Sequence, residues 1–164
     1  VMPVQGITQG TQPIMSYNFG AKNFQRVRQV FKRLLTVTMT VTITAFIIVS
    51  LFPGQLAQIF NDDQELVALV DRVMPVFFAG IWAFGAQMAC QTTFMALGQA
   101  KTSLFLALLR KVILLVPLAI LLPRITNSVM GVYIAEPVAD ILASATTLTI
   151  FLTRRKKLLP TPKD

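Results

Sequence analysis

The sequence has no histidine, a single cysteine and few charged residues, and each shortage excludes a class of chemistry. Without histidine there is no His-based catalytic triad, no histidine metal ligand and no ordinary proton shuttle at neutral pH. Cys90 alone cannot form an intrachain disulfide or a multi-cysteine zinc site. No nucleophile and base constellation is left, so we expect a protein that is not an enzyme and needs no cofactor.

Charged residues make up 13% of the 164 residues, against roughly a quarter in ordinary soluble domains. Hydrophobic residues make up 54%, which excludes intrinsic disorder. Too little charge remains to cover a water-facing globule of this size. The length fits roughly four to five membrane spans of about 20 residues each, with short connections.

Five long apolar stretches lie between the charged residues, and we treat them as one helical membrane domain over residues 1–164. The first is interpreted as the last part of a span, because the chain begins with Val1 and is expected to be a fragment. Each of the other four is long enough to cross the ~30 Å hydrocarbon core as a helix. The stretches cover residues 1–19, 34–52, 73–97, 104–123 and 129–152, and a basic tail follows over 153–164.

Residues 36–44 alternate with a period of two, as a half-buried strand does, with threonine at every second position. A transmembrane barrel would need this pattern in many ~10-residue segments, and here it occurs once. A lone strand cannot satisfy its backbone in lipid, whereas a helix can, and threonine hydroxyls can bond the preceding turn. We therefore expect a helix over 36–44.

The fifteen lysines and arginines give a net charge of +8, but they lie in short clusters without the aromatic-rich basic face of a nucleic-acid binder. No nucleic-acid partner is expected. Along successive connections their counts alternate five, one, three, one and five, so thirteen of the fifteen fall on one side. The positive-inside rule makes that side cytoplasmic, together with the C-terminus. The acidic residues at the outer connection are then Asp62, Asp63, Glu65 and Asp71.

The basic clusters also have an ordinary explanation, because such clusters set topology and contact anionic lipid headgroups. Membrane lipids are therefore expected partners. Arg110 and Lys111 lie inside the fourth stretch, where they could line a pathway. We expect them instead to extend along the helix to the cytoplasmic interface.

Glu136 and Asp140 are the most informative polar residues, because both lie within the fifth stretch. Their i, i+4 spacing puts both carboxylates on one helix face. A carboxylate within a span is costly and usually faces a protein interior or a watery cavity. A carboxylate withdrawn from water beside a like charge also exchanges protons more readily near neutral pH. The alternative is that Glu136, about 10 Å into its helix, is shallow, hydrated and structural.

Uncharged polar residues within the stretches form a second set of candidates for a substrate or ion pathway. Interhelical hydrogen bonds explain such residues about as often as substrate contacts do. Two of them, four residues apart in the third stretch, share a helix face. The set consists of Gln12, Asn18, Gln87 and Gln91.

Prolines and small residues indicate where the helices bend and pack. Pro117 and Pro137 each remove a backbone donor inside a stretch and strain the preceding turn, so we expect kinks there. Small residues four apart allow close helix approach. Two such stripes occur, at Gly6 and Gly10 and at Ala135, Ala139 and Ala143.

Three motifs occur in order along the chain: residues 10–23 (GTQPIMSYNFGAKN), 94–103 (FMALGQAKTS) and 131–140 (GVYIAEPVAD). Together they resemble the second half of multidrug and toxic compound extrusion (MATE) transporters, with most similarity to the MepA-like branch of Gram-positive bacteria. The resemblance covers essentially the whole chain, and the first motif is fairly specific.

The resemblance implies an all-α integral membrane protein with twelve helices in two lobes, in which this chain is a polytopic helical bundle from late helix 8 to helix 12. It implies antiport across the bacterial plasma membrane, in which a proton or sodium ion enters as a cationic, amphipathic drug leaves. The implied partners are those drugs and the missing N-terminal lobe. Branches differ in which helix carries the coupling carboxylate, so Glu136 and Asp140 both remain candidates.

Two alternatives remain. The first is a lipid-linked saccharide flippase of the same superfamily, although such proteins usually place several cations in the central cavity. The second is a small membrane scaffold protein that is complete at 164 residues and transports nothing.

Overall fold

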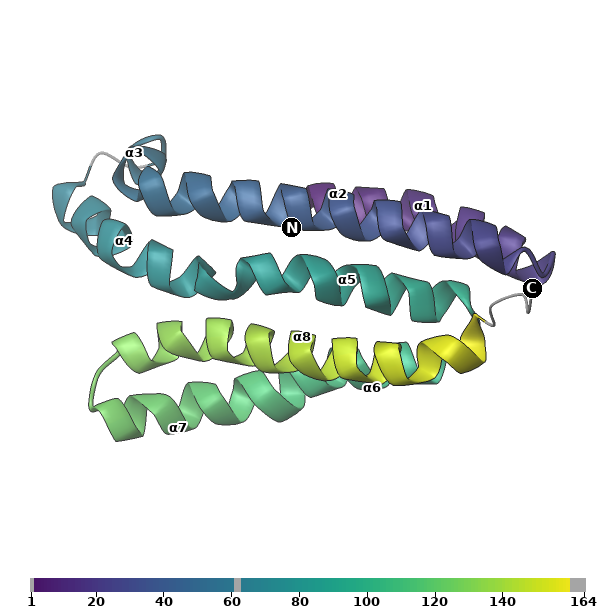
Figure 1. The fold of residues 1–164 in the computed structure, drawn as a ribbon. Coiled ribbons are helices and arrows are strands. Elements are labelled where there is room, and N and C mark those ends of the chain that lie inside the picture. Colours follow the sequence, from purple (N-terminus) through teal and green to yellow (C-terminus); the bar gives the residue numbers. More distant parts are fainter. Residues whose placement is uncertain (1, 61–62, 160–164) are drawn as a thin grey trace.

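The computed structural model describes residues 2–60 and 63–159, and every regular element within these ranges is a helix (Figure 1). The prediction of an all-α fold is therefore confirmed. The elements are α1 (Met2–Gly20), α2 (Phe24–Leu51), α3 (Pro53–Gln58), α4 (Gln64–Phe77), the 3-10 helix η1 (Phe78–Gly80), α5 (Ile81–Ala96), α6 (Ala100–Leu108), the π-helix η2 (Leu109–Leu115), α7 (Val116–Thr126) and α8 (Met130–Leu158).

Four helical runs in the described part of the chain are long and apolar enough to cross a membrane. These four runs correspond to the last four predicted stretches, although three of the stretches reach one residue beyond the run. Each run also includes polar residues outside the predicted stretch. The first element, α1, is helical where a partial span was predicted but is not among the four. The runs are Phe24–Leu51, Gln64–Ala96, Ala100–Thr126 and Met130–Arg155.

The alternating segment 36–44 is helical within α2, as predicted. The Thr40 hydroxyl donates to the Thr36 carbonyl at 2.9 Å, and the Thr42 hydroxyl donates to the Thr38 carbonyl at 3.0 Å. Each hydroxyl is thus satisfied within its own helix. The Thr40 side chain, which is exposed, can therefore face lipid without an unbonded hydroxyl donor.

A tight turn joins α1 to α2 in the first of the quoted motifs. Lys22 adopts a left-handed backbone conformation, with φ of 56°. The Asn23 side chain then accepts a hydrogen bond from the Arg26 amide at 3.1 Å, which satisfies one of the donors at the start of α2. The turn reverses the chain within three residues.

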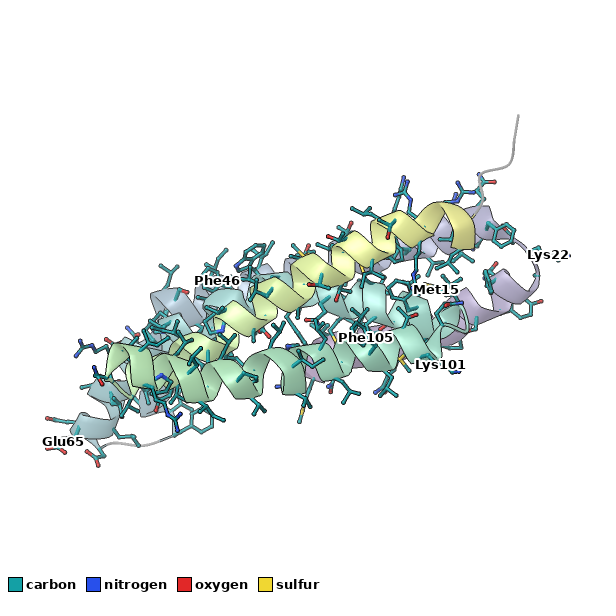
Figure 2. The ribbon with its side chains drawn as sticks, turned by 90° about the horizontal axis from the view of Figure 1, so that it is seen from below. Met15, Lys22, Phe46, Glu65, Lys101 and Phe105 are labelled. Atoms are coloured by element: carbon teal, nitrogen blue, oxygen red, sulfur yellow. The ribbon has the colours of Figure 1, made fainter. Side chains whose placement is uncertain are left out.

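The long helices run back and forth, with α5 packed between α2 on one side and α8 on the other (Figure 1). Helix α1 packs against both α2 and α5, and α7 packs against α8. Figure 2 places Lys22 and Lys101 at one end of the bundle and Glu65 at the other. This arrangement agrees with the prediction that basic and acidic connections alternate between the two ends of the bundle. We call the end with Lys22 and Lys101 the basic end and the end with Glu65 the acidic end. Asp62, predicted at the acidic end, lies outside the described residues.

Close packing around α5 depends on glycines that leave room for neighbouring backbone. A Cβ atom at Gly85 would lie 2.5 Å from the Thr42 Oγ1 atom and 2.8 Å from the Thr38 carbonyl oxygen. A Cβ atom at Gly80 would lie 2.7 Å from the Cα atom of Pro137. The first contact brings α2 against α5, and the second brings α8 against the 3-10 turn before α5.

Only one of the two predicted small-residue stripes packs as expected. The alanine stripe of α8 is buried, with at most 1% of each residue exposed. The prediction of close approach at Gly6 and Gly10 is wrong for the described chain, since no neighbouring atom lies within 4 Å of a Cβ built there. The stripe confirmed as packed comprises Ala135, Ala139 and Ala143.

The two prolines occupy different environments. Pro117 lies in the first turn of α7, directly after the π-helix Leu109–Leu115, so the helix is irregular immediately before it. Pro137 lies inside α8, which continues through it without interruption. The kinks at both positions stay predictions.

Replacing Gly85 with alanine should destabilise the α2–α5 contact. The added methyl group would meet the Thr42 hydroxyl and the Thr38 carbonyl, and overpacking of this kind costs about 1–3 kcal/mol. The purified Gly85→Ala variant should therefore unfold at a lower temperature in detergent. The matched control is Gly20→Ala, where a Cβ meets nothing within 4 Å; an equal melting temperature for the two variants would contradict the argument.

Candidate functional site

Four charged side chains meet where η2 faces α8. The Arg110 Nε atom donates to Asp140 Oδ1 at 2.5 Å, and its second guanidinium nitrogen donates to Glu136 Oε1 at 3.3 Å. The Lys111 Nζ atom lies 3.5 Å from the same Glu136 oxygen. Glu136 and Asp140 therefore share one face of α8, as their spacing predicted, and that face meets two cations.

These charges are withdrawn from solvent to different extents. The exposed fraction of the side chain is 8% for Asp140, 15% for Arg110 and 19% for Glu136, but 58% for Lys111. Two cations and two carboxylates give the cluster no formal net charge. Since an uncompensated charge is expensive away from water, Arg110 and Asp140 each depend on the other.

The cluster lies deep in the bundle rather than at its end. Arg110 is about 15 Å along the helix from Ala100 at the basic end, at 1.5 Å per residue. Asp140 is about as far along α8 from Met130 at the acidic end. Both positions therefore fall near the middle of a ~30 Å hydrocarbon core.

The expectation that Arg110 and Lys111 extend to the interface is wrong. Two carboxylates across the helix contact offer both cations a partner inside the bundle. The Arg110 guanidinium also lies 4.4 Å from the centroid of the Phe84 ring, a cation–π contact. These contacts replace the water that Arg110 would otherwise have to reach at the membrane surface.

A cavity of about 390 Å³ opens beside the charged cluster. Aromatic side chains form another part of its wall, including Phe77, Phe78 and Phe84. The polar part of the wall unites four of the predicted pathway residues with the two cations: Gln87, Gln91, Arg110, Lys111, Glu136 and Asp140.

Gln87 and Gln91 are equivalent in the sequence but differ in the structure. The Gln91 Nε2 atom donates to the Ser103 carbonyl at 3.3 Å, so this side chain ties α5 to α6. Gln87 is 1% exposed, and its Oε1 atom has no hydrogen-bond partner among the described residues. A buried carbonyl oxygen without a partner is uncommon, and this one belongs to a residue that lines the cavity.

The remaining predicted pathway residues, Gln12 and Asn18, do not line this cavity. The Asn18 Nδ2 atom donates to the Ile14 carbonyl of its own helix at 2.8 Å, and Gln12 is partly exposed on α1. Sequence reasoning left Arg110 and Lys111 out of the site. The signal that could have placed them there is a pair of basic residues in one apolar stretch opposite a pair of acidic residues in the next.

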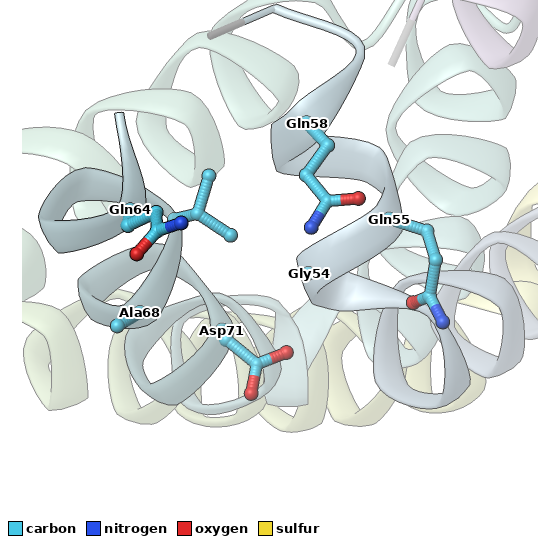
Figure 3. Close-up of a pocket in the computed structure, with 7 residues that line it drawn as sticks. Gly54, Gln55, Gln58, Gln64, Ala68 and Asp71 are labelled. Atoms are coloured by element: carbon cyan, nitrogen blue, oxygen red, sulfur yellow. The ribbon is translucent and has the colours of Figure 1, made fainter. Parts of the chain in front are cut away.

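A second cavity, of about 590 Å³, lies at the acidic end between α3 and α4 (Figure 3). Glutamine side chains and the carboxylate of Asp71 line it, but most of these side chains are exposed. No cation pairs with Asp71 among the described residues. The first cavity, with its buried charges, is therefore the candidate functional site.

A sequence model of the MatE family matches residues 1–121, which is most of the chain. The chain belongs to the MatE family. The resemblance to MATE transporters is thereby confirmed, whereas the MepA-like branch stays a prediction. The matched residues include Gln87 and Arg110 but end before α8, which carries both carboxylates.

Solved structures extend the similarity over α8. The MATE multidrug transporter DinF-BH, solved in complex with R6G, is 34% identical and superposes with a TM-score of 0.88, covering 96% of this chain and 35% of that one. An outward-facing MATE family transporter of the MOP superfamily has 17% identity and a TM-score of 0.88, covering 97% of this chain and 36% of that one. An inward-facing one has 17% identity and a TM-score of 0.89, covering 99% and 38%.

The chain thus spans little more than a third of the length of these transporters. No curated protein matched it. The comparisons and the four apolar helical runs make it a multi-pass membrane protein of a transporter family rather than of an enzyme family.

Replacing Arg110 with glutamine should destabilise the protein far more than the same change at Lys111. Removing one partner of a buried ion pair costs about 3–5 kcal/mol, whereas an exposed pair contributes about 1 kcal/mol or less. Chemical unfolding in detergent measures both. Neutralising the orphaned carboxylate in Arg110→Gln/Asp140→Asn should recover part of the loss; equal losses for Arg110→Gln and Lys111→Gln would refute the pairing.

Proposed function

We propose that this chain is part of the second lobe of a secondary multidrug exporter. In the twelve-helix transporter it would run from late in the eighth helix to the end of the twelfth, so its α1 would be part of that eighth helix. The complete transporter would export cationic, amphipathic drugs across the bacterial plasma membrane in exchange for protons or sodium ions. The observation that carries the proposal is the mid-bundle cluster of Arg110 with two carboxylates at the wall of a cavity. Ionisable residues at such a depth are rare and mark ion or substrate pathways.

The two carboxylates suit different roles. Asp140 is the more buried, and Arg110 binds it at the shorter distance, so Asp140 holds the guanidinium in place. Glu136 is held at 3.3 and 3.5 Å, in part by the largely exposed Lys111. Lys111 can turn towards water at little cost. Glu136 is therefore the carboxylate to which an incoming proton or sodium ion, or an outgoing cationic drug, binds.

Coupling follows from competition for this carboxylate. A proton on Glu136 removes the charge that attracts a cationic drug, so drug and proton cannot both bind strongly. A ligand shifts a conformational equilibrium by its difference in affinity for the two states. Binding of the ion favours one orientation of the cavity and binding of the drug favours the other.

The side chains that line the cavity are suited to a flat, cationic substrate. Phe77 and Phe78 offer aromatic rings, whose faces attract cations, while Arg110 already occupies a face of Phe84. Met88 adds a flexible, polarisable side chain that adapts to varied shapes. The buried Gln87 carbonyl oxygen can accept a hydrogen bond from a substrate N–H group.

Alternating access is proposed as rocking of the two lobes around the site. In support, this chain superposes about equally well on an outward-facing and an inward-facing transporter, with TM-scores of 0.88 and 0.89. A lobe whose fold is the same in both states can move as one body. We place the basic end and the C-terminus in the cytoplasm by the positive-inside rule.

The flippase alternative is less well supported, because the cavity has no excess of positive charge. Its two cations face two carboxylates, and Arg110 is engaged with both. A lipid-linked saccharide carries phosphates, which need cations that are not already neutralised. Membership of a transporter family also disfavours a scaffold protein.

Replacing Glu136 with glutamine in the full-length transporter should reduce drug efflux at least tenfold while membrane levels stay unchanged, because Arg110 keeps its bond to Asp140. Drug accumulation in energised vesicles, with the proton gradient and the sodium gradient imposed separately, measures the loss and identifies the ion. The control is Glu65→Gln, which removes an exposed carboxylate at the acidic end. Wild-type efflux by Glu136→Gln would sink the assigned role.

Replacing Gln87 with leucine should weaken drug binding and yet leave the protein as stable as before or more so. Leucine has a similar volume and removes a buried acceptor that has no partner, so the fold loses no hydrogen bond from it. Drug affinity of the purified transporter, measured with its melting temperature, tests both halves. Gln91→Leu is the comparison, since it breaks the bond to Ser103 and should lower the melting temperature; unchanged drug affinity in Gln87→Leu would argue against a substrate contact.

A further inference from the structure

Helix α1 carries three glutamines along one side. Gln5, Gln9 and Gln12 are spaced by four and by three residues, so their side chains lie on one face of the helix. Gln5 and Gln9 are exposed and Gln12 is partly exposed, whereas another face of α1, with Val4 and Met15, is buried in the bundle. We call the three glutamine side chains the amide stripe.

The amide stripe begins at the candidate functional site and extends towards the basic end. Gln5 lines the cavity of that site. From there α1 runs from the middle of the bundle (Figure 1) to the turn with Lys22 at the basic end (Figure 2). Gln9 is about 16 Å along the helix from Gly20, at 1.5 Å per residue. Since α1 packs against two membrane-spanning helices, α2 and α5, the stripe lies at the depth of the hydrocarbon core.

The amide groups of the stripe have no hydrogen-bond partner among the described residues. Other polar side chains on these helices are satisfied locally. The Thr11 hydroxyl donates to the Ile7 carbonyl of α1 at 2.6 Å, and the exposed Thr36 hydroxyl donates to the Lys32 carbonyl of α2 at 3.0 Å. Lipid tails offer no hydrogen bonds, so unpaired amide groups are costly in hydrocarbon. The amide stripe therefore needs water, a substrate or another protein helix beside it.

A face of α5 accompanies the stripe from the candidate functional site towards the basic end. Met88 and Gln91 line the cavity together with Gln5, and Met95, one turn further along α5, is 46% exposed. One turn beyond the stripe, the Ser16 hydroxyl donates to the carbonyl of Ala96, the neighbour of Met95, at 3.1 Å. The two helices thus stay side by side, and amides and methionines border one surface.

The surface beside the stripe is open in the described chain. No described atom lies within 4 Å of a Cβ built at Gly6 or Gly10, which lie next to the stripe on α1. The chain spans little more than a third of the matched transporters, so the missing lobe would supply the facing wall. A helix packed directly on the stripe would cover Gln5 and with it the wall of the candidate site. Water between the lobes instead satisfies the amides and leaves the site open.

We propose that Gln5, Gln9 and Gln12 line a water-filled passage from the basic end to the candidate functional site, along which a cationic, amphipathic drug enters. The proposal rests on the proposed function for the nature of the drug. The amides hydrogen-bond water and the N–H groups of a drug, and they carry no charge that would trap a cation on its way. The flexible methionine side chains of α5 contact the apolar part of the drug.

The test is cysteine accessibility in the full-length transporter, in a background with Cys90→Ala and no other cysteine. Gln9→Cys, Gln12→Cys and Thr36→Cys are compared in inside-out membrane vesicles. The reagent is a membrane-impermeant methanethiosulfonate with a trimethylammonium group, which reacts with the thiolate that forms in water but not in lipid. Thr36 is the matched control, because it is exposed on α2 about 18 Å along the helix from Phe24.

Both stripe cysteines should be labelled at least tenfold faster than the cysteine at position 36. Labelling is measured with and without an imposed proton gradient, because rocking of the lobes would open the passage in one state. Labelling no faster than the control under both conditions would overturn the passage. Because labelling does not require efflux, this failure is distinct from a failure of the role assigned to Glu136.

The drug as the occupant is tested with tetraphenylphosphonium, a cationic and amphipathic probe. Its addition should slow the labelling of Gln9→Cys at least threefold, because a probe in the passage shields the thiol. It should leave the labelling of Thr36→Cys unchanged. Fast labelling of Gln9→Cys that the probe does not slow would overturn the entry of the drug by this route.

A second variant separates the passage from packing against the missing lobe. Gln9→Leu/Gln12→Leu should raise the KM for drug at the cytoplasmic face at least threefold, with kcat and the melting temperature close to wild type. Gln9→Asn/Gln12→Asn keeps amide groups and should restore most of the loss. A lower melting temperature in the leucine variant would show that the amides bond to the other lobe. Either that result or an unchanged KM would overturn the proposal.

Discussion

The ion pair between Arg110 and the carboxylates of α8 is the contact on which the interior of this bundle depends. Each partner alone would be a charge buried near the middle of the hydrocarbon core, so each is tolerable only where the other lies within reach. The pairing in turn requires α8 to run close to its neighbours. The buried alanine stripe and the absence of a Cβ at Gly80 permit that approach.

Much of the fold follows from local sequence pattern, because a membrane admits few alternatives. Apolar length places the helices, and the alternation of cations between connections assigns each turn to one of two ends. The threonines of α2 illustrate this constraint. They alternate with the period of a strand, but the segment is helical, because in lipid only a helix satisfies its own backbone hydrogen bonds.

The site was only half predictable, because the other half depends on partners. Spacing put Glu136 and Asp140 on one face, but the position of Arg110 along its own helix suggested the membrane surface. The opposing carboxylates decided otherwise. Likewise Gln87 and Gln91 are the same residue type on one helix face, and the sequence does not distinguish them. Gln91 connects α5 to α6 because the Ser103 carbonyl lies within reach, whereas the Gln87 carbonyl oxygen has no partner among the described residues. Gly6 and Gly10 failed as a packing stripe for the same reason, since no helix of the described chain lies against them.

The π-helix between α6 and α7 gives this part of the chain a property that an ordinary helix lacks. Its hydrogen bonds close over five residues instead of four, so the turns on either side are out of phase by about one residue, or roughly 100°. Leu106, before the offset, turns wholly into the apolar core, and Arg110, within it, turns towards α8. One membrane crossing thereby places an apolar side chain in the core of the bundle and, four residues later, a charged side chain against α8.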